Sequence, residues 1–249
     1  MRLVTASAGN HGRALAHAAR ELGLPLVVFI AENAPRAKID AITAAGAELR
    51  PCRDYDAAEA EAKRFAASGG GLFISPYSHP DVIAGAGTVA LELLDDVKGL
   101  DAVIVPVGGG GLVSGIGIAV KALSPSTRVI GVEVAASSPF THSLAAGHLV
   151  MIDVQPSLAD GLTGNLDPDT ITLDIVRAVV DDIVVVEEDA VRRGVRDVVV
   201  HEHLVAEGAA AVGIAALTSN TIDVTGRRVA VILTGANIDS HALVDVLGL

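Results

Sequence analysis

The sequence has a single cysteine, Cys52, so it cannot form a disulfide within the chain. Aromatic residues make up only 2% of the chain, although 51% of its residues are apolar. The core must therefore consist of valine, isoleucine, leucine and alanine, which is typical of parallel strands buried on both faces. There is no uninterrupted apolar run of membrane-spanning length and no signal-peptide pattern. We therefore expect a cytoplasmic protein that does not enter a membrane.

Basic residues are also scarce, because 18 lysines and arginines stand against 30 acidic residues and give a net charge of −12. This balance argues against nucleic acids and anionic membrane surfaces as partners. The histidines form no metal-binding pattern, since His201 and His203 would lie on different faces of a helix, and no metal site is expected. The G-x-S-x-G motif of serine hydrolases is absent. Four acidic residues are interpreted as a solvated helix junction rather than catalytic acids: Asp181, Asp182, Glu187 and Glu188.

Four consecutive glycines follow an apolar stretch at residues 101–107: Gly108, Gly109, Gly110 and Gly111. A helix-like apolar pattern begins at Leu112. A strand, a glycine turn and a helix start direct several backbone N–H groups at one place, which is typical of a phosphate site. No frame gives G-x-G-x-x-G, and Ile116 stands where a P-loop requires lysine. A turn that only lets the helix pack against the strand is the alternative, but it would need just one or two glycines.

Strand patterns alternate with amphipathic helix patterns along the chain, which predicts a mostly parallel α/β fold with right-handed crossovers. Residues 135–169 have a looser pattern, typical of an irregular segment that faces a site. Three turns of small residues directly follow predicted strands, at residues 6–12, 108–111 and 234–237. Ligands of such sheets bind at the carboxyl ends of the strands, so the three turns can share one cleft.

The residues in these turns carry a family resemblance. Residues 6–12 read Ala-Ser-Ala-Gly-Asn-His-Gly, and residues 234–237 read Thr-Gly-Ala-Asn. Together with the tetraglycine, and in this order, they resemble the motifs of fold-type II pyridoxal-phosphate enzymes, and within that group the threonine/serine dehydratases. Ala-Asp-Gly at residues 159–161 and Glu-Gly-Ala at residues 207–209 are also similar to segments of those enzymes.

The resemblance implies two open, mostly parallel, three-layer α/β/α domains with the cofactor cleft between them. Residues 1–78 would form the small domain with the Asn-His-Gly substrate loop, and residues 79–249 the large cofactor-binding domain. The tetraglycine and Leu112 would hold the phosphate of pyridoxal 5′-phosphate, Asn10 would touch its 3′-oxygen, and Thr234 would face its pyridine nitrogen. Glu207 is a weaker candidate, with an acid at a helix start as the alternative. The first turn would bind the substrate carboxylate through Ser7, Gly9, Asn10 and His11.

Two features depart from the family pattern. Ala8 stands where racemases of this group have a serine, which favours a dehydratase. The Schiff-base lysine of the family precedes the Asn-His-Gly turn, and only nine residues precede Asn10 here. We therefore expect that the segment with this lysine, which also supplies part of the large domain's sheet, is missing. None of the four lysines present is expected to replace it: Lys38, Lys63, Lys98 and Lys121.

The favoured function is a pyridoxal-phosphate-dependent ammonia-lyase that converts small β-hydroxy amino acids, such as L-threonine or L-serine, to 2-oxo acids and ammonia. The resemblance also suggests a homodimer. One alternative is a non-catalytic remnant of such an enzyme, and another is a doubly wound binding protein for a different phosphate ligand. If part of the central sheet is missing, an apolar strand edge is exposed, and we expect the isolated chain to associate.

Overall fold

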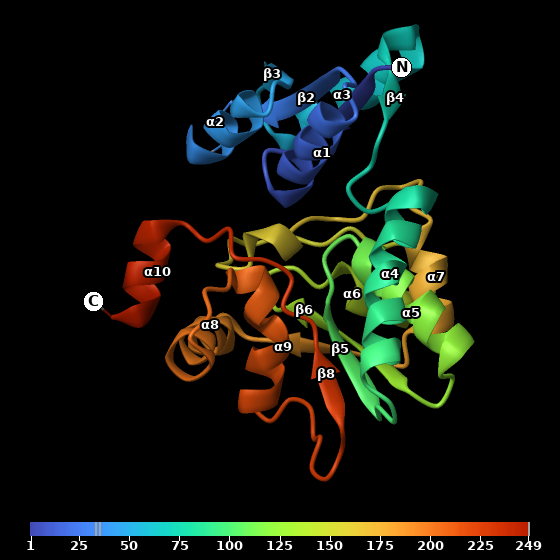
Figure 1. Ribbon diagram of the computed structural model, residues 1–249, viewed down its shortest axis with the longest axis vertical. Coiled ribbons are helices and arrows are strands. Elements are labelled where there is room, and N and C mark those ends of the chain that lie inside the picture. The colour runs from blue at the N-terminus through green and yellow to red at the C-terminus, as the bar shows by residue number, and fades with distance from the viewer. Residues whose placement is uncertain (33, 35, 249) are drawn as a thin grey trace. The chain divides into compact units, whose positions relative to one another are not determined.

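The computed structural model describes residues 1–32, 34 and 36–248, and the side chain of Lys38 lies outside the described part. The chain divides into two compact units, Met1–His79 and Pro80–Leu249. Each unit has a sheet and a core of its own (Figure 1). The cleft expected between them stays a prediction.

The first unit contains a four-stranded sheet of order β3-β2-β1-β4 in which every pair of neighbours is parallel. One face packs on α1 and α2 through a core that includes Ala16 and Ile42. The other face packs on α3 through Ala58 and Ala62. Helices on both faces give three layers. The elements are β1 (Leu3–Ala6), α1 (Asn10–Glu21), β2 (Leu26–Ala31), α2 (Arg36–Ala44), β3 (Glu48–Cys52), α3 (Tyr55–Phe65) and β4 (Leu72–Phe73).

Strand β4 is shorter than its sequence suggests, because the apolar pattern predicts a strand over residues 72–75. The amide of Ile74 still donates to the carbonyl of Val4. The carbonyl of Ile74, however, accepts hydrogen bonds from side chains, with Thr5 Oγ1 at 2.8 Å and His11 Nε2 at 3.3 Å. Two side chains thus occupy the carbonyl that would continue the ladder, and the strand ends.

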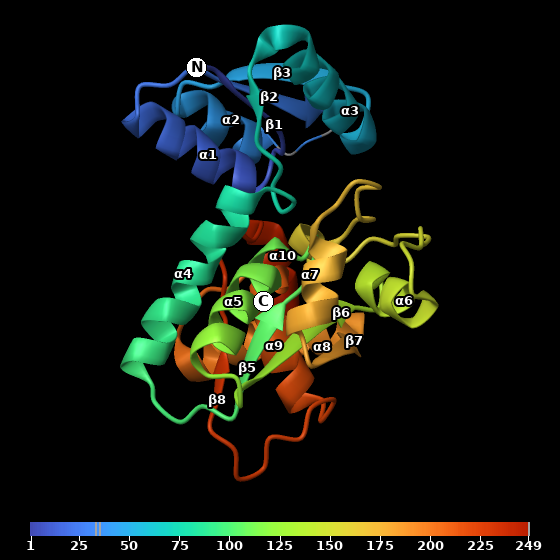
Figure 2. The same cartoon turned by 90° about the vertical axis from the view of Figure 1, so that its right-hand side faces the viewer.

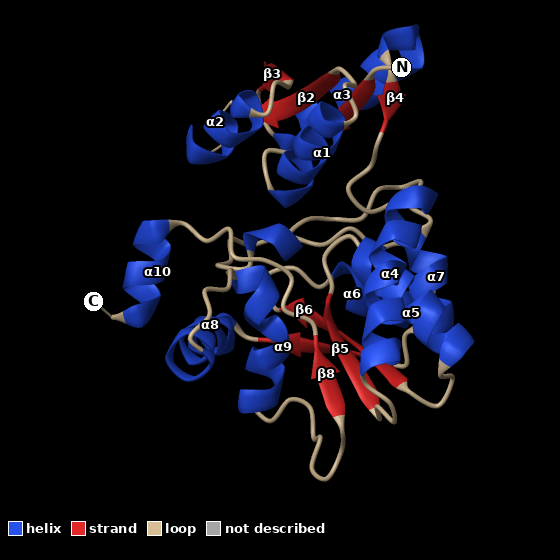
Figure 3. Ribbon diagram, viewed as in Figure 1, coloured by secondary structure: helices blue, strands red, loops and turns tan. Residues whose placement is uncertain are grey.

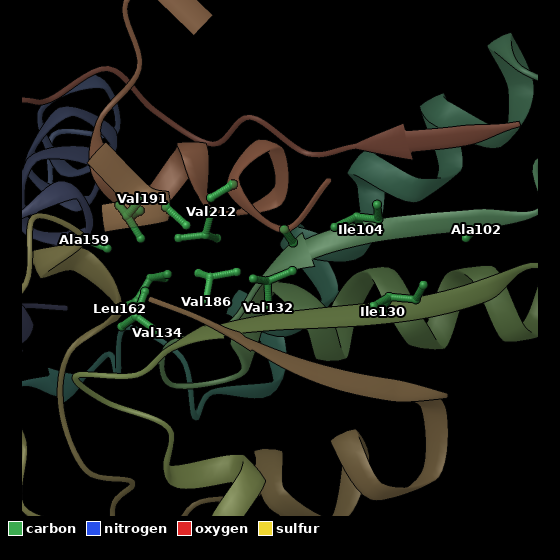
Figure 4. Packing of buried hydrophobic residues seen from close by; sticks show 14 residues of the cluster. Ala102, Ile104, Ile130, Val132, Val134, Ala159, Leu162, Val186, Val191 and Val212 are labelled. Carbon is green, nitrogen blue, oxygen red and sulfur yellow. The ribbon is translucent and has the colours of Figure 1, made fainter. Parts of the chain in front are cut away.

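The second unit contains a parallel four-stranded sheet of order β7-β6-β5-β8 (Figure 2). One face packs on α8 and α9 through Val191, Val212 and Ala215, and Figure 4 shows part of this cluster. The other face packs on α4, α5 and α7 through Ala90, Val113 and Val176. The elements are α4 (Pro80–Asp96), β5 (Ala102–Pro106), α5 (Gly111–Leu123), β6 (Arg128–Val134), α6 (Pro139–Ala146), a 3₁₀ turn (Asp160–Leu162), α7 (Thr172–Val179), β7 (Asp182–Val186), α8 (Glu188–Glu202), α9 (Gly208–Thr218), β8 (Val229–Val231) and α10 (Ser240–Leu247).

The predicted fold class is confirmed, because both units are parallel sheets covered by helices on two faces. The looser pattern at residues 135–169 corresponds to α6, the 3₁₀ turn and connecting segments without regular structure (Figure 2). None of the helices in the described residues has the length and apolar character needed to cross a bilayer. Within the same residues, no group of three or more His, Cys, Asp or Glu side chains could hold a metal ion.

Candidate cofactor and substrate sites

The tetraglycine follows β5 at the carboxyl end of the sheet, and its last residue, Gly111, is the first residue of α5. After β5, the amide of Val107 still donates to Val132 of β6. Gly110 is the N-cap of α5, with φ +84°, and no side chain caps this helix start. The first amides of a helix have no partner inside the helix, so this uncapped turn presents backbone donors and the positive end of the helix dipole. Such an arrangement suits a phosphate group.

Close packing explains two of the four glycines. A Cβ atom on Gly108 would lie 3.0 Å from Leu162 Cα and 3.3 Å from the carbonyl oxygen of Gly161. A Cβ atom on Gly110 would overlap the ring of Phe140, and the positive φ of Gly110 is itself unfavourable for other residues. The packing-turn alternative therefore accounts for part of the run, and the uncapped helix start is a separate property of the same loop.

Three other segments of the second unit meet near this loop. The 3₁₀ turn contacts it through Gly161 and Leu162. A Cβ atom on Gly161 would lie 3.3 Å from the Cβ of Ala209, so this turn also lies against the start of α9. The amide of Glu207 donates to the carbonyl of Gly235 at 3.0 Å, which links α9 to the last turn. The structure thus brings together the four motifs of this unit on which the family resemblance depends.

Thr234 and Glu207 occupy different environments within this group. Thr234 follows β8 and is exposed, so its hydroxyl is accessible. Glu207 is the N-cap residue of α9 and is 4% exposed. The carbonyl of Glu207 accepts from the amides of Ala210 and Ala211. Its position matches the alternative given for it, an acidic residue at a helix start, where the dipole favours negative charge.

In the first unit, the turn after β1 is stabilised by its own serine. Ser7 Oγ accepts a hydrogen bond from the amide of Gly9 at 3.2 Å. Asn10, expected in the turn, is the first residue of α1, and Gly9 is an N-cap without side-chain capping. A Cβ atom on Gly12 would overlap the carbonyl of Ser7, so the helix can start here only with glycine at that position. An uncapped helix start with backbone donors suits a carboxylate for the same reason that it suits a phosphate.

His11 points its imidazole into the first unit. Its Nε2 lies 3.1 Å from Thr5 Oγ1 and 3.3 Å from the carbonyl oxygen of Ile74. A carbonyl oxygen only accepts, so Nε2 carries a proton. Burial lowers the pKa of His11, against a smaller opposing effect of the hydrogen bond to Ile74. The neutral ring therefore has an unprotonated Nδ1, which cannot donate to a carboxylate. The backbone amide of His11 is the better donor for that ligand.

The chain matches known proteins over nearly all of its length. Residues 1–235 match the model of a family described as pyridoxal-phosphate dependent enzyme. The chain belongs to this family. It is 37% identical over 242 residues to the L-threonine ammonia-lyase of Thermotoga maritima, which covers 97% of this chain and 60% of that enzyme. It is 36% identical to the catabolic L-threonine dehydratase of Escherichia coli, over 99% of this chain and 75% of that one.

Solved structures have the same fold. Maize serine racemase superposes with a TM-score of 0.90 at 31% identity, over 98% of this chain and 75% of that chain. Threonine deaminase isoform 2 of Solanum lycopersicum also gives a TM-score of 0.90 at 31% identity, over 100% of this chain and 74% of that chain. The chain thus spans between about three fifths and three quarters of the relatives named here.

Pyridoxal 5′-phosphate is the cofactor of this family, and the residues present fit it. The phosphate requires backbone donors, which the uncapped start of α5 provides. The loop before this helix has two glycines at which a side chain would meet neighbouring atoms, so it can adopt this path only with a bare backbone. Thr234, at the end of β8, supplies an accessible neutral hydroxyl.

The lysines with described side chains lie elsewhere. Lys63 is in α3 of the first unit, where it pairs with Glu59 at 3.2 Å. Lys98 precedes β5 and donates to the carbonyl of Leu94 at 2.7 Å. Lys121, in the last turn of α5, donates to Asp181 at 2.6 Å. Lys98 and Lys121 thus lie near the amino ends of the strands, whereas the glycine loop lies at the carboxyl ends.

Two of the acidic residues interpreted as a solvated junction also accept defined hydrogen bonds, and of these Glu188 is half-buried whereas Asp181 is exposed. Glu188 accepts hydrogen bonds from Ser157 Oγ at 2.6 Å and from the amide of Leu158 at 2.8 Å, and so anchors the segment before the 3₁₀ turn. Asp181 accepts from Lys121 and from the amide of Val129. Burial would raise the pKa of Asp181, but these hydrogen bonds outweigh it and hold the pKa below its usual range. The partners lie far away in the sequence, so no local pattern indicated them.

Proposed function

We propose that this chain acts as a pyridoxal-phosphate-dependent ammonia-lyase that converts L-threonine and L-serine to 2-oxo acids and ammonia. Relatives named threonine ammonia-lyase and threonine dehydratase support this proposal. The structural observation that supports it most is the glycine loop before the uncapped start of α5, packed against the 3₁₀ turn. A binding protein for another phosphate ligand would need this loop but not the exposed hydroxyl of Thr234, which follows β8, the strand paired with β5.

In this proposal, the second unit holds the cofactor. The amides of the tetraglycine and Leu112 bind the phosphate, and Thr234 accepts or donates a hydrogen bond at the pyridine nitrogen. When bound, pyridoxal phosphate accepts the electrons released when the Cα proton of the substrate is removed. Thr234 is neutral, so it does not keep the ring nitrogen protonated as a carboxylate would. A weaker electron sink favours rapid loss of the β-hydroxyl over a long-lived carbanion.

The first unit binds and orients the substrate in this proposal. Ser7 offers the carboxylate its hydroxyl proton and Asn10 offers the first amide of α1, and Asn10 would also reach the 3′-oxygen of the cofactor. The amide of Gly9, which donates to Ser7 Oγ, would exchange this partner for the carboxylate. His11 contributes its backbone amide, while its ring fixes the turn to Thr5 of β1 and to Ile74, the residue after β4. Orienting the substrate by its carboxylate limits which bond at Cα can break.

Racemisation is the reaction that most needs to be separated from elimination, since serine racemases have this fold. Racemases add a proton on the second face of Cα and so require a second acid. Ala8 stands where such a serine is found in racemases, and alanine carries no proton to transfer. We therefore expect oxo-acid formation from L-serine without D-serine. Ala8→Ser tests this reading, because it adds the missing acid.

The experiment combines spectroscopy with product analysis. The purified protein is mixed with pyridoxal 5′-phosphate, its visible absorption is recorded, and the mixture is reduced with borohydride and mapped by mass spectrometry. In a separate, unreduced portion of the mixture, oxo acid is measured from L-threonine, L-serine and D-serine. A visible band with oxo acid from the L-substrates supports the ammonia-lyase, and a labelled lysine identifies the attachment point. If there is no visible band, no labelled lysine and no oxo acid, the result favours the non-catalytic remnant. If the protein shows none of these three but binds nucleotides, the result favours a binding protein for another phosphate ligand.

We further propose that the protein works as a homodimer in the cytoplasm. The family resemblance supports the dimer, and the acidic charge with one cysteine suits a reducing compartment without anionic partners. Light scattering at several protein concentrations tests the dimer, which should keep one mass throughout.

A further inference from the structure

The glycine loop is attached to a buried threonine that lies 63 residues further along the chain. Thr172, the first residue of α7, is fully buried, and its hydroxyl donates to the carbonyl of Gly109 at 2.8 Å. Thr170 Oγ1 lies 2.8 Å from Thr172 Oγ1. Since the hydrogen of Thr172 is used on Gly109, the hydroxyl of Thr170 is the donor between the two. The result is a chain from Thr170 through Thr172 to the glycine loop, in which each bond strengthens the next.

This contact fixes the direction of an amide. The described residues contain no cis peptide bond, and in a planar trans peptide the N–H points opposite to the C=O. Because the carbonyl of Gly109 is directed at Thr172, the N–H of Gly110 is directed away from it. Gly110 is the N-cap of α5, so this amide belongs to the donors that precede the helix.

Without the contact, the peptide between Gly109 and Gly110 would be free to turn. Glycine reaches both halves of the φ range at little cost, so a peptide between two glycines rotates more easily than others. Rotation by half a turn would exchange the N–H for the carbonyl oxygen and place a partial negative charge where an anion is to bind. The Cβ of Thr172, 3.1 Å from a Cβ built on Gly110, also limits the space around the loop.

We propose that Thr172 is a positioning residue for the cofactor phosphate: its hydroxyl holds the Gly109 carbonyl and thereby aims the Gly110 amide at the phosphate. The proposal rests on the function proposed above and adds a determinant of phosphate affinity that does not itself touch the cofactor. It predicts an effect specific to the phosphate, since the rest of the cofactor makes no use of this amide.

The test compares Thr172→Val, which has the same shape without the donor, with Thr172→Ser, which keeps the donor. The ligands are pyridoxal 5′-phosphate and pyridoxal, which lacks the phosphate. We expect Thr172→Val to weaken pyridoxal 5′-phosphate binding about 10-fold or more, as for one lost hydrogen bond to a charged site, and to leave pyridoxal binding within about twofold. Thr172→Ser should bind both ligands like the wild type. Equal losses for both ligands in Thr172→Val, or no loss, would overturn the proposal.

A second measurement does not depend on the cofactor. The amide signals of Gly109 and Gly110 in the NMR spectrum of the ligand-free protein should move in Thr172→Val and stay in place in Thr172→Ser. Unmoved signals in the valine variant would also overturn the proposal. If the wild type binds neither ligand, the proposed function fails, and the amide signals still decide whether Thr172 holds the peptide. Far-ultraviolet circular dichroism confirms that each variant is folded.

Discussion

At the scale of single residues, Gly110 combines two constraints that mutations can separate. Its φ of +84° disfavours a side chain, and a Cβ atom would also overlap Phe140 and lie 3.1 Å from Thr172 Cβ. We expect Gly110→Ala to lower the free energy of unfolding by about 2–5 kcal/mol, from left-handed strain and overpacking together, and to abolish cofactor binding. Gly147→Ala is the matched control, because Gly147 has φ +76° with nothing within 4 Å of the added Cβ.

The control should cost about 1–2 kcal/mol, the strain alone. Urea unfolding followed by circular dichroism measures both variants. If the two cost the same, the packing of the glycine loop against Phe140 contributes nothing and the argument for a bare backbone at Gly110 is wrong.

His11 should make the stability of the first unit depend on pH. Burial lowers its pKa in the folded protein below the unfolded value of about 6.5. Between these two values the unfolded state binds more protons, so stability is full above about pH 6.5 and falls as the pH drops toward the folded pKa, by at most about 1.4 kcal/mol per pH unit. Both tyrosines, Tyr55 and Tyr77, lie in the first unit, so tyrosine fluorescence in urea reports on it alone.

His11→Gln should flatten this pH dependence, while His17→Gln, at an exposed position on the same helix, should leave it unchanged. An equal slope in the wild type and in His11→Gln would show that another group causes the loss of stability at acid pH.

Residues whose role depends on the local backbone could be predicted from the sequence. Residues that act through partners far away in the sequence could not. The tetraglycine and the turn at residues 6–12 stand out because their composition is locally unusual. Thr172 and Glu188 do not, because threonine and glutamate are ordinary residues at helix starts. Only the folded chain brings Thr172 to Gly109 and Glu188 to Ser157. The roles assigned to Ser7, Asn10 and Thr234 stay predictions.

At the scale of elements, the apolar strands were the most predictable. The runs at residues 128–134 and 182–186 have the bounds that their apolar pattern predicts. Irregular segments were not predictable in detail, because their paths depend on single side chains. The segment before the 3₁₀ turn is an example: Glu188 holds it by Ser157 and Leu158, and a Cβ on Gly208 would overlap the carbonyl of Leu158.

The two hydrogen bonds of Glu188 can be tested by comparing its alanine variant with that of the neighbouring residue Asp189. Glu188→Ala removes the acceptor of both hydrogen bonds, while Asp189→Ala removes an exposed charge from the same first turn of α8. The interaction with the helix dipole is lost in both. We expect Glu188→Ala to lower the free energy of unfolding by about 2 kcal/mol more than Asp189→Ala, as for hydrogen bonds to a charged group.

Limited proteolysis measures whether the segment at residues 149–158 is released. We expect this segment to be cleaved faster in Glu188→Ala and not in Asp189→Ala. Equal cleavage in the two alanine variants would mean that Glu188 does not restrain the segment, and circular dichroism in urea then shows whether any stability difference has another source.

At the scale of the whole molecule, each unit has cores on both faces of its own sheet. The two-sided covering of each sheet could be predicted from the sequence, because apolar strands of this composition are typical of parallel sheets with helices on both faces. The edges of the sheets follow from strand order, which the sequence does not contain. In the second unit the order β7-β6-β5-β8 makes β8 an edge strand (Figure 3).

The edge at β8 is a candidate site of association between chains. An edge strand presents unpaired backbone groups to other chains, and an apolar edge promotes association. Leu233, two residues beyond β8, is 39% exposed. If this edge pairs between chains in place of the closed dimer, the chain forms species whose mass grows with concentration, as in open-ended pairing, and Leu233→Lys reduces this growth, since lysine at an edge opposes pairing. Leu22→Lys, at a 70% exposed position in the first unit, is the control and should leave association unchanged.

Light scattering coupled to size exclusion distinguishes this association from the proposed homodimer. A symmetric dimer closes on itself and keeps one mass at every concentration, whereas edge pairing continues. A constant dimer mass that Leu233→Lys does not alter would therefore support the homodimer and contradict pairing at β8. A monodisperse monomer with cooperative melting would contradict both, and would mean that the twist and short length of β8 are enough to protect its edge.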